Sequence, residues 1–123
     1  MTRGQAIYSW LSCFGVDSYA VDAVPNTVSY PYLTYDASNG FWGDSDTPLI
    51  INLYYRDTSG AVANAKAEEI CAAIGRGGKI IPCDGGAVWL KRGDPAWQSI
   101  KNTDDDKIRQ RYISIDMQWL TLD

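Results

Sequence analysis

Two stretches of the chain repeat apolar residues at the spacing of an amphipathic helix. The first covers residues 3–14 and is followed by Gly15, a natural helix stop. The second covers residues 59–74, where Ser59 is placed to cap the helix and a run of glycines ends it. The apolar positions are Ile7, Trp10, Leu11 and Phe14 in the first stretch, and Ala63, Ala67, Ile70 and Ile74 in the second. We therefore expect two helices, each with one buried face.

Elsewhere apolar residues alternate with polar ones, which is typical of strands with one buried side. The alternation is clearest near the C-terminus, where the two faces are Ile113, Ile115, Met117, Trp119 and Ser114, Asp116, Gln118. Further strands are expected over residues 19–24, 32–35, 49–55, 79–82, 87–92 and 97–100. A turn is expected at residues 93–95 and an acidic loop at residues 104–106.

The order of these elements predicts the fold class. Residues 32–35 and 49–55 form one expected hairpin, and residues 79–82 and 87–92 form another. Because neighbouring strands are joined by turns and not by helical crossovers, the sheet should be mostly antiparallel. The two amphipathic helices would then cover one face of it. We predict a single α+β domain over residues 1–123.

Composition narrows the class of protein. The chain has 123 residues, of which 46% are hydrophobic and 21% charged, and this apolar content excludes a disordered chain. No run approaches the roughly 18 apolar residues of a transmembrane helix, so no membrane partner is expected. The net charge of −4 and the lack of a basic stripe argue against a nucleic-acid-binding protein. Three dispersed cysteines and a start without a signal-peptide pattern predict reduced thiols and synthesis in the cytoplasm; they are Cys13, Cys71 and Cys83.

No residue pattern predicts catalysis, a cofactor or a metal site. Histidine is absent, which removes the commonest general base and the commonest transition-metal ligand. The glycine-rich run before Lys79 lacks the order of a phosphate loop, and it follows a helix instead of preceding one. The acidic triplet 104–106 lacks the spacing of an EF-hand, and Asp44 and Asp46 lie in an open loop of turn residues. We expect a protein without enzymatic activity.

Several residues outside the periodic faces are candidates for contacts with other proteins. Phe41 and Trp42 lie in a loop of turn residues, and exposed aromatic pairs often mark interfaces; the alternative is that the loop folds back and buries one ring. Trp97 is a similar case. Charged candidates form two basic patches beside the acidic triplet, either as solvated strand ends or as a charge-complementary rim between copies. They are Lys91, Arg92, Asp105, Arg109 and Arg111.

The last strand is predicted to reach beyond the body of the domain. A chain of 123 residues folds into a domain about 35 Å across. Residues 108–121 in extended form span roughly 48 Å. The polar start of the strand would then form a projecting two-stranded arm with residues 97–100, tipped by residues 104–106. Such an arm is marginal alone in water, so it needs a partner surface.

Short strings along nearly the whole chain resemble a known family. Their order is Ile7-Tyr8 with Trp10-Leu11, then Tyr30-Pro31-Tyr32-Leu33-Thr34-Tyr35, then Ala63-Asn64-Ala65-Lys66-Ala67-Glu68-Glu69-Ile70, then Ile74-Gly75 with Gly77-Gly78-Lys79, then Gly85-Gly86-Ala87-Val88-Trp89-Leu90-Lys91-Arg92-Gly93, then Arg109 with Arg111-Tyr112-Ile113, and last Trp119-Leu120-Thr121. In this order the chain is similar to the small tail terminator, or tail completion, proteins of long-tailed phages, prophages and phage-tail-like particles. The strings are structural and include no catalytic signature.

The resemblance implies an α+β subunit that assembles with copies of itself into a ring, commonly a hexamer, at the end of the tail tube. Such a ring stops polymerisation of the tube protein and offers a surface to the head–tail connector or neck protein, while DNA passes through its bore without specific binding. The expected location is the neck end of the virion tail. The residues themselves leave open a neck adaptor, a monomeric cytosolic binding module and a metal-dependent nuclease.

Overall fold

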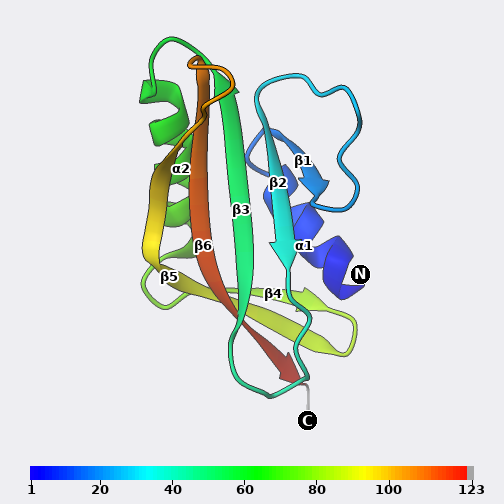
Figure 1. Cartoon of the computed structure of the whole chain (residues 1–123). Coiled ribbons are helices and arrows are strands. Elements are labelled where there is room, and N and C mark those ends of the chain that lie inside the picture. The colour runs from blue at the N-terminus through cyan, green and yellow to red at the C-terminus, as the bar shows by residue number, and fades with distance from the viewer. Residues whose placement is uncertain (122–123) are drawn as a thin grey trace.

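The computed structural model describes residues 1–121, within which there are two helices and six strands (Figure 1). In chain order the elements are α1 (Arg3–Ser12), β1 (Asp17–Ala20), β2 (Tyr32–Ala37), β3 (Thr47–Arg56), α2 (Ala61–Ile74), β4 (Lys79–Cys83), β5 (Gly86–Lys101) and β6 (Ile108–Thr121). The strands form one sheet in the order β1-β2-β3-β6-β5-β4. Neighbouring strands are antiparallel except β1 and β2, which are parallel. The predicted α+β class and the mostly antiparallel sheet are confirmed.

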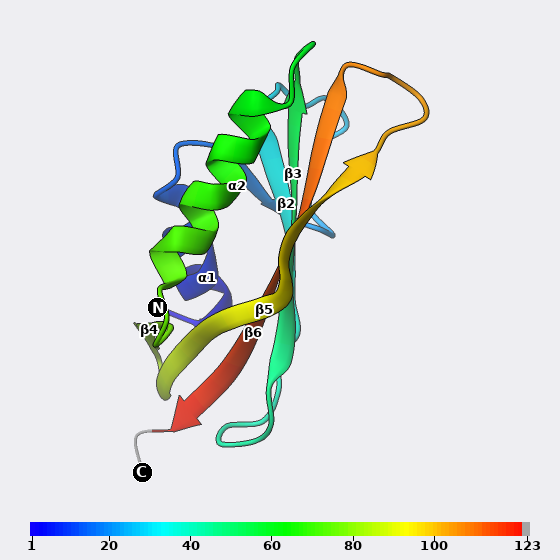
Figure 2. The same ribbon diagram turned by 90° about the vertical axis from the view of Figure 1, so that its left-hand side faces the viewer.

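The sheet is strongly curled, because its two longest strands bend as they cross it. Figure 2 shows that the C-terminal half of β6 and the N-terminal half of β5 bend away from the direction of β3. β4 pairs only with residues Gly86–Leu90 of β5. From Lys91 onward, within the described residues, β5 therefore has a strand partner on one side alone, which is β6.

The hydrophobic core forms where the predicted apolar faces meet. α2 packs against β3, β5 and β6, and α1 contacts β1 and β4. The expected apolar faces of both helices are buried, as are alternate residues of the long strands. The strand residues in the core include Leu49, Ile51, Leu53, Val88, Leu90, Ile113, Ile115, Met117 and Trp119. The alternation predicted for the last strand is therefore confirmed.

The helix ends show how local sequence sets the boundaries. At the start of α1, Thr2 and Gln5 form a capping box, in which each side chain accepts a hydrogen bond from the other residue's backbone N–H. The prediction of Ser59 as the first residue of the second helix is wrong by two positions, because Gly60 is the N-cap. Ser59 Oγ still accepts a hydrogen bond from the Ala61 backbone N–H at 3.2 Å. Gly75, with a φ of 73°, ends α2 as expected.

The turn expected at residues 93–95 is wrong, because β5 continues through it. The register shifts between Arg92 and Trp97, so the residues between them bulge from a ladder that resumes on the same partner, β6. At Gly93 the backbone of β5 lies very close to β6. Only glycine permits this approach, because a β-carbon there would collide with the backbone carbonyl of Ser114. Glycine and proline thus mark a bulge inside one long strand.

Two further predictions on strands need correction. The strand expected over residues 19–24 begins earlier and ends at Ala20, where a turn follows. The start of β6 is not a two-stranded arm, because β3 pairs with it as far as Arg56 opposite Ile108 while β5 pairs on its other side. β3 is long enough to support β6 from its first residue. Figure 2 shows that the connection between β5 and β6 is what stands away from the sheet.

Candidate contact surfaces

The connection between β2 and β3 separates its two aromatic rings. Phe41 is 83% exposed. Trp42 instead packs edge-on against the core residue Trp119, with ring centroids 5.9 Å apart at an angle of 77°. The alternative that the loop folds back on one ring therefore describes Trp42, which is partly buried, and its role as a contact residue stays a prediction. A burying partner exists because the C-terminal strand brings Trp119 to this end of the sheet.

Arg3 fixes this connection to the body of the protein. Its guanidinium lies 4.1 Å from the ring centroid of Trp42 and 4.8 Å from that of Trp119. The same group donates a hydrogen bond to the Gly40 carbonyl at 2.7 Å. The Gly43 N–H donates to the Trp119 carbonyl at 2.7 Å. Phe41 is thus an exposed ring on a connection held at several points.

Trp97 and the basic pair in β5 differ in how free they are. Trp97 packs against the core, and its Nε1–H donates to Glu68 Oε1 at 2.9 Å, so it is not a free contact ring. The Lys91 ammonium lies 2.8 Å from Asp46 Oδ1 and donates to Gln118 Oε1 at 3.2 Å. Arg92 is exposed, and among the described residues it forms no ion pair. Of the three, Arg92 remains a candidate rim charge.

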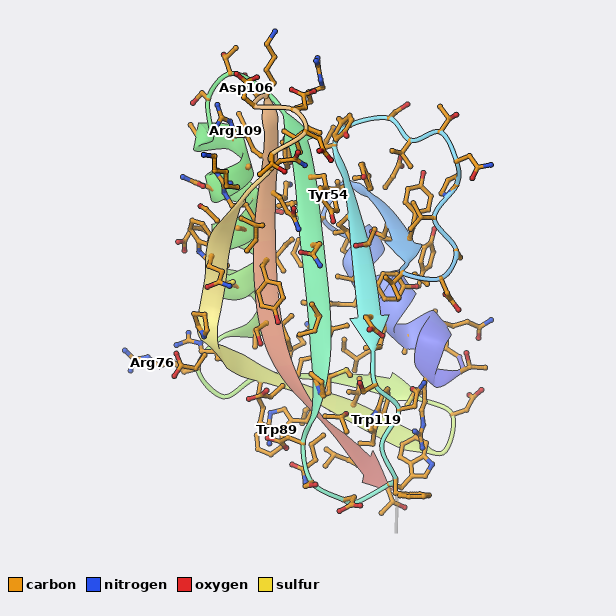
Figure 3. All side chains as sticks on the ribbon, viewed as in Figure 1. Tyr54, Arg76, Trp89, Asp106, Arg109 and Trp119 are labelled. Carbon is orange, nitrogen blue, oxygen red and sulfur yellow. The ribbon has the colours of Figure 1, made fainter. Side chains whose placement is uncertain are left out.

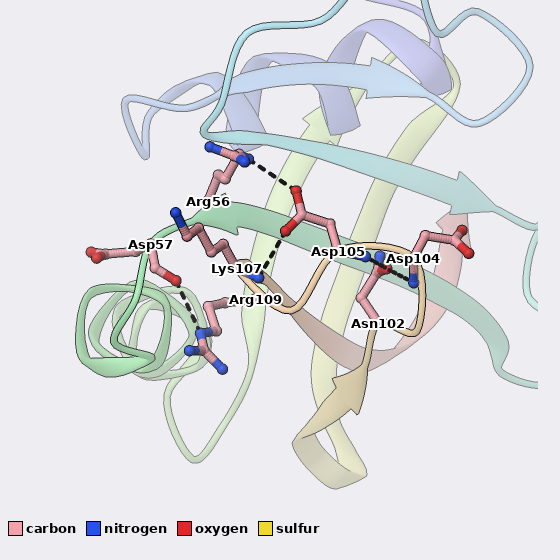
Figure 4. Close-up of polar contacts among 7 residues, drawn as sticks. All are labelled: Arg56, Asp57, Asn102, Asp104, Asp105, Lys107 and Arg109. Carbon is pink, nitrogen blue, oxygen red and sulfur yellow. Dashed lines mark hydrogen bonds and ion pairs between the residues drawn. The ribbon is translucent and has the colours of Figure 1, made fainter.

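The acidic triplet is organised as a tight turn (Figure 4). Asp105 Oδ1 accepts the backbone N–H of Lys107 at 2.9 Å, and Oδ2 lies 3.1 Å from Arg56 Nε. These two donors lower the pKa of the Asp105 carboxyl below its ordinary value. The side chain of Asn102 accepts hydrogen bonds from the next backbone N–H groups of the turn. Asp105 is therefore bonded within its own chain through Arg56.

Arg109 and Arg111 do not form the predicted exposed patch, because both are bonded to the segment that starts α2. Arg109 donates from Nε to the Asp57 carbonyl at 3.2 Å (Figure 4). Its Nη2 donates to the Thr58 carbonyl. Arg111 is only 6% exposed, and its Nε donates to Asn64 Oδ1 at 2.7 Å. Burial, and then the nearby Arg109, lower the pKa of the Arg111 guanidinium. Both guanidinium groups are therefore engaged within the monomer, and their place in a rim between copies stays a prediction.

A cluster of tyrosines is a surface that the sequence analysis missed. The Tyr32 ring stacks on Tyr54 with centroids 4.9 Å apart, and its centroid lies 5.3 Å from that of Tyr30 and 6.2 Å from that of Tyr19. Burial raises the pKa of Tyr32 and of Tyr54. Figure 3 shows Tyr54 at the opposite end of β3 from Trp119. Tyr32 meets Tyr54 only because of the register between β2 and β3, which the sequence does not give. The sequence alone shows Tyr30 and Tyr32 near each other in the chain but not the cluster.

A hollow of about 320 Å³ lies between α2 and β5. Its lining includes Cys71, Ala72, Ile74 and Ala96, together with the charged Glu68 and Arg92. Burial raises the pKa of the Cys71 thiol, whose Sγ lies 3.8 Å from the Ala96 carbonyl oxygen. Cys83 is also partly buried and Cys13 is exposed. Most of the lining residues have small or apolar side chains, so the hollow suits an apolar side chain better than a charged ligand.

Residues 1–121 contain no group of three or more histidine, cysteine, aspartate or glutamate side chains placed to hold a metal ion. Neither helix in this range has the length and apolar character needed to cross a membrane. What the geometry offers is a set of surfaces for contacts. They are the exposed ring of Phe41, the tyrosine cluster, the free edge of β5 and its hollow.

No family model matches the chain, and no curated protein matches it. A chain in a solved structure superposes with a TM-score of 0.60, covering 92% of this chain and 86% of that one, at 13% sequence identity. Nothing in that protein's description names an activity or a partner. At this identity the likeness concerns the fold alone, so the two chains share an architecture.

Proposed function

We propose that this chain is a structural subunit of a phage-type tail, which closes the end of the tail tube as a ring of copies. In this role it stops polymerisation of the tube protein and offers the surface on which a head–tail connector or neck protein docks. It acts without catalysis or a cofactor, and DNA passes through the ring without specific binding. Its place is the neck end of the tail.

The observation that carries the proposal is that strings of the tail-terminator resemblance coincide with elements that shape the fold. The string at residues 30–35 supplies most of β2, and the string at residues 63–70 is the centre of α2. In the string at residues 85–93, a β-carbon on Gly86 or Gly93 would collide with backbone carbonyls of β6. The strings that resemble tail terminators therefore include residues that this fold requires. This supports the proposal that the chain has the fold, and with it the role, of that family.

We also infer that α1 and α2 cover the same face of the sheet. In support, both helices add buried side chains to one hydrophobic core, together with alternate residues of β3 and β6. The residues between them on these strands, such as Asn52, Tyr54 and Tyr112, are only partly buried. A second, helix-free face suits a ring subunit, which must contact neighbouring copies, the tube and the neck at the same time.

The exposed aromatic groups support a role in assembly. Phe41 is presented by a connection that Arg3 and Trp42 already hold in place, so binding would order little additional chain. The tyrosine cluster supplies a second aromatic surface at the other end of β3. Large aromatic rings on rigid supports are frequent anchors of protein interfaces.

The test is the morphology of particles produced without this protein. A producing strain that lacks the gene should give tubes of irregular, excess length and heads without joined tails. The wild-type chain supplied in trans should restore normal particles. Phe41→Ser should restore them poorly, whereas Val62→Ser should restore them fully, because Val62 is exposed on α2 away from the Phe41 connection.

The outcomes separate the alternatives. Tails of normal length that lack heads would indicate a neck adaptor instead. Normal, fully joined particles would contradict a role in the virion and favour a monomeric binding module. Metal-dependent turnover of nucleic acid that disappears when Asp44, Asp46 or Asp104 is replaced would favour a nuclease.

A further inference from the structure

The half of the sheet that ends in β1, called the acidic side below, carries acidic residues without cations to neutralise them. Residues 4–55, which include β1, β2 and all of β3 except its last residue, contain five aspartates and no lysine or arginine. That last residue, Arg56, is paired with Asp105. Asp17, Asp22 and Asp36 are exposed and form no ion pair within the described part of the chain. Arg3 lines the same hollow as Asp22 and Asp36, but its guanidinium is bonded to the Gly40 carbonyl and stacked on a tryptophan. This side therefore favours a cationic partner.

The half of the sheet that ends in β5 and β4, called the basic side below, carries an excess of lysine and arginine. Residues 76–101, which include β4 and β5, contain five lysines and arginines and two aspartates. Four of the cations are exposed and take part in no ion pair within residues 1–121; they are Arg76, Lys79, Arg92 and Lys101. Figure 3 shows Arg76 pointing outward from this side. This side also carries Asp84, which is paired with the N-terminal ammonium, and the exposed Asp94 in β5. Asp116 lies opposite Lys91 in the β5–β6 ladder, and Glu68 on α2 already accepts a hydrogen bond from Trp97.

The connection between β1 and β2 exposes apolar side chains on the acidic side. Residues 21–31 are exposed almost throughout, with Val21 at 55% and Val24 and Tyr30 each at 38%. The connection contains one charged residue, Asp22. Figure 1 shows it beyond β1, on the far side of the sheet from β5. An exposed apolar segment of this kind is a typical protein-contact element.

The basic side offers a matching seat. Beyond Leu90 the outer edge of β5 has no strand partner within the described residues. Apart from the Ala96 carbonyl, which lies 3.8 Å from Cys71 Sγ, its outward backbone N–H and C=O groups can therefore pair with another chain. The 320 Å³ hollow lies beside this edge and is lined by small and apolar groups such as Ala72 and Ala96. Arg92 belongs both to the hollow and to the free edge. The seat thus combines an apolar hollow, a backbone edge and a cation.

We propose that the 21–31 connection of one copy docks on the free half of β5 in the next copy. Val24 and its neighbours fill the hollow between α2 and β5, and Asp22 faces Arg92. Because the two surfaces lie on opposite sides of one sheet, every copy supplies one and receives the other. Such a head-to-tail contact closes into a ring when its rotation permits. The inference deepens the proposed function. The contact between copies is argued from the structure alone, and only the biological purpose of the ring rests on the proposed function.

The first test uses the purified chain alone, without tube or neck protein. In a background with Cys13, Cys71 and Cys83 changed to serine, Val24→Cys and Ala72→Cys give two single-cysteine variants. With a short bismaleimide, a mixture of the two should yield dimers, and a chain carrying both cysteines should yield a ladder of oligomers. Neither variant alone should react with itself. Val62→Cys, on α2 but outside the hollow, replaces Ala72→Cys as the matched control and should give no product.

The second test keeps the native cysteines, so it stands if the cysteine-free background folds poorly. Val24→Ser and Val62→Ser both change exposed valines without changing the charge, and sedimentation velocity at low salt measures self-association. Val24→Ser should weaken association on the order of tenfold, and Val62→Ser should leave it unchanged. A wild-type chain that stays monomeric, equal effects of the two variants, or crosslinks between two Val24→Cys chains would overturn the proposal. Head-to-tail crosslinks together with normal particles from the gene deletion would support this contact and contradict the tail function.

Discussion

At the scale of single residues, Arg111 is a buried cation held by neutral groups. It is 6% exposed, and its guanidinium donates to Asn64 Oδ1 at 2.7 Å and to the Gln110 carbonyl at 3.0 Å. Arg111→Glu would place an unpaired carboxylate there and should lower the free energy of unfolding by about 3–5 kcal/mol. Urea unfolding measures this change. The exposed Arg92→Glu is the matched control and should shift it by less than about 0.5 kcal/mol; equal effects would show that α2 does not hold Arg111.

Asp105 gives a prediction about pH. Its pKa is lowered by the Lys107 backbone N–H and then by Arg56, so its charge stabilises the folded turn above the carboxyl pKa of the unfolded chain. That stabilisation is lost as the pH falls through the lower, folded-state pKa. In an NMR titration, the Asp105 carboxyl should have a lower midpoint in the folded protein than in urea. Arg56→Gln should raise the folded midpoint and Lys101→Gln should not; a midpoint insensitive to Arg56→Gln would contradict the role of the ion pair.

At the scale of elements, the β2–β3 connection tests the division between a core ring and a surface ring. Trp42→Ala removes the contact with Trp119 and the stack with Arg3, and should cost about 2–4 kcal/mol of unfolding free energy. Phe41→Ala removes an exposed ring and should change it by less than about 0.5 kcal/mol. Chemical denaturation of the two variants makes the comparison. The reverse order would place Phe41 in the core and Trp42 at the surface.

Periodicity predicts an element well where burial is one-sided. The faces of both helices and of β6 follow the 3.6-residue and two-residue periods because each packs on one core. The segment Gly93-Asp94-Pro95 was misassigned because glycine and proline are equally at home in a turn and in a bulge. Only the partner strand decides, and β6 is paired on both sides of the segment. Local chemistry therefore marks an irregularity without giving its kind.

The contact residues were less predictable than the elements. Lys91, Arg56, Arg109 and Arg111 find their partners between 45 and 52 residues away in the chain. A sequence read locally shows such side chains as charged and free. Phe41 was predictable as a ring without a periodic place, whereas the stacking of Tyr32 on Tyr54 depends on strand register. Tertiary pairing thus engages several candidate rim charges within the monomer and creates an aromatic surface.

At the scale of the whole molecule, charges that form ion pairs within the monomer and exposed charges that form none have different roles. The ion pairs within residues 1–121 are four, and each has at least one partly exposed partner. They contribute little to stability individually. The exposed aspartates beside β1 and β2 and the exposed cations beside β4 and β5 remain unneutralised on opposite sides of the sheet. Salt should therefore act on association between copies more than on folding.

The last prediction concerns this difference. Raising the ionic strength from 0.1 M to 1 M shortens the Debye length from about 10 Å to about 3 Å, so self-association should weaken steeply while the melting temperature of the monomer changes little. Sedimentation velocity and thermal unfolding across one salt series measure the two quantities. Asp22→Lys and Arg92→Glu should each weaken association at low salt. An equimolar mixture of the two should recover part of it, because a wild-type contact and a charge-swapped contact alternate around the assembly. Association that strengthens with salt, or a mixture no better than its components, would show that these charges do not meet across the contact.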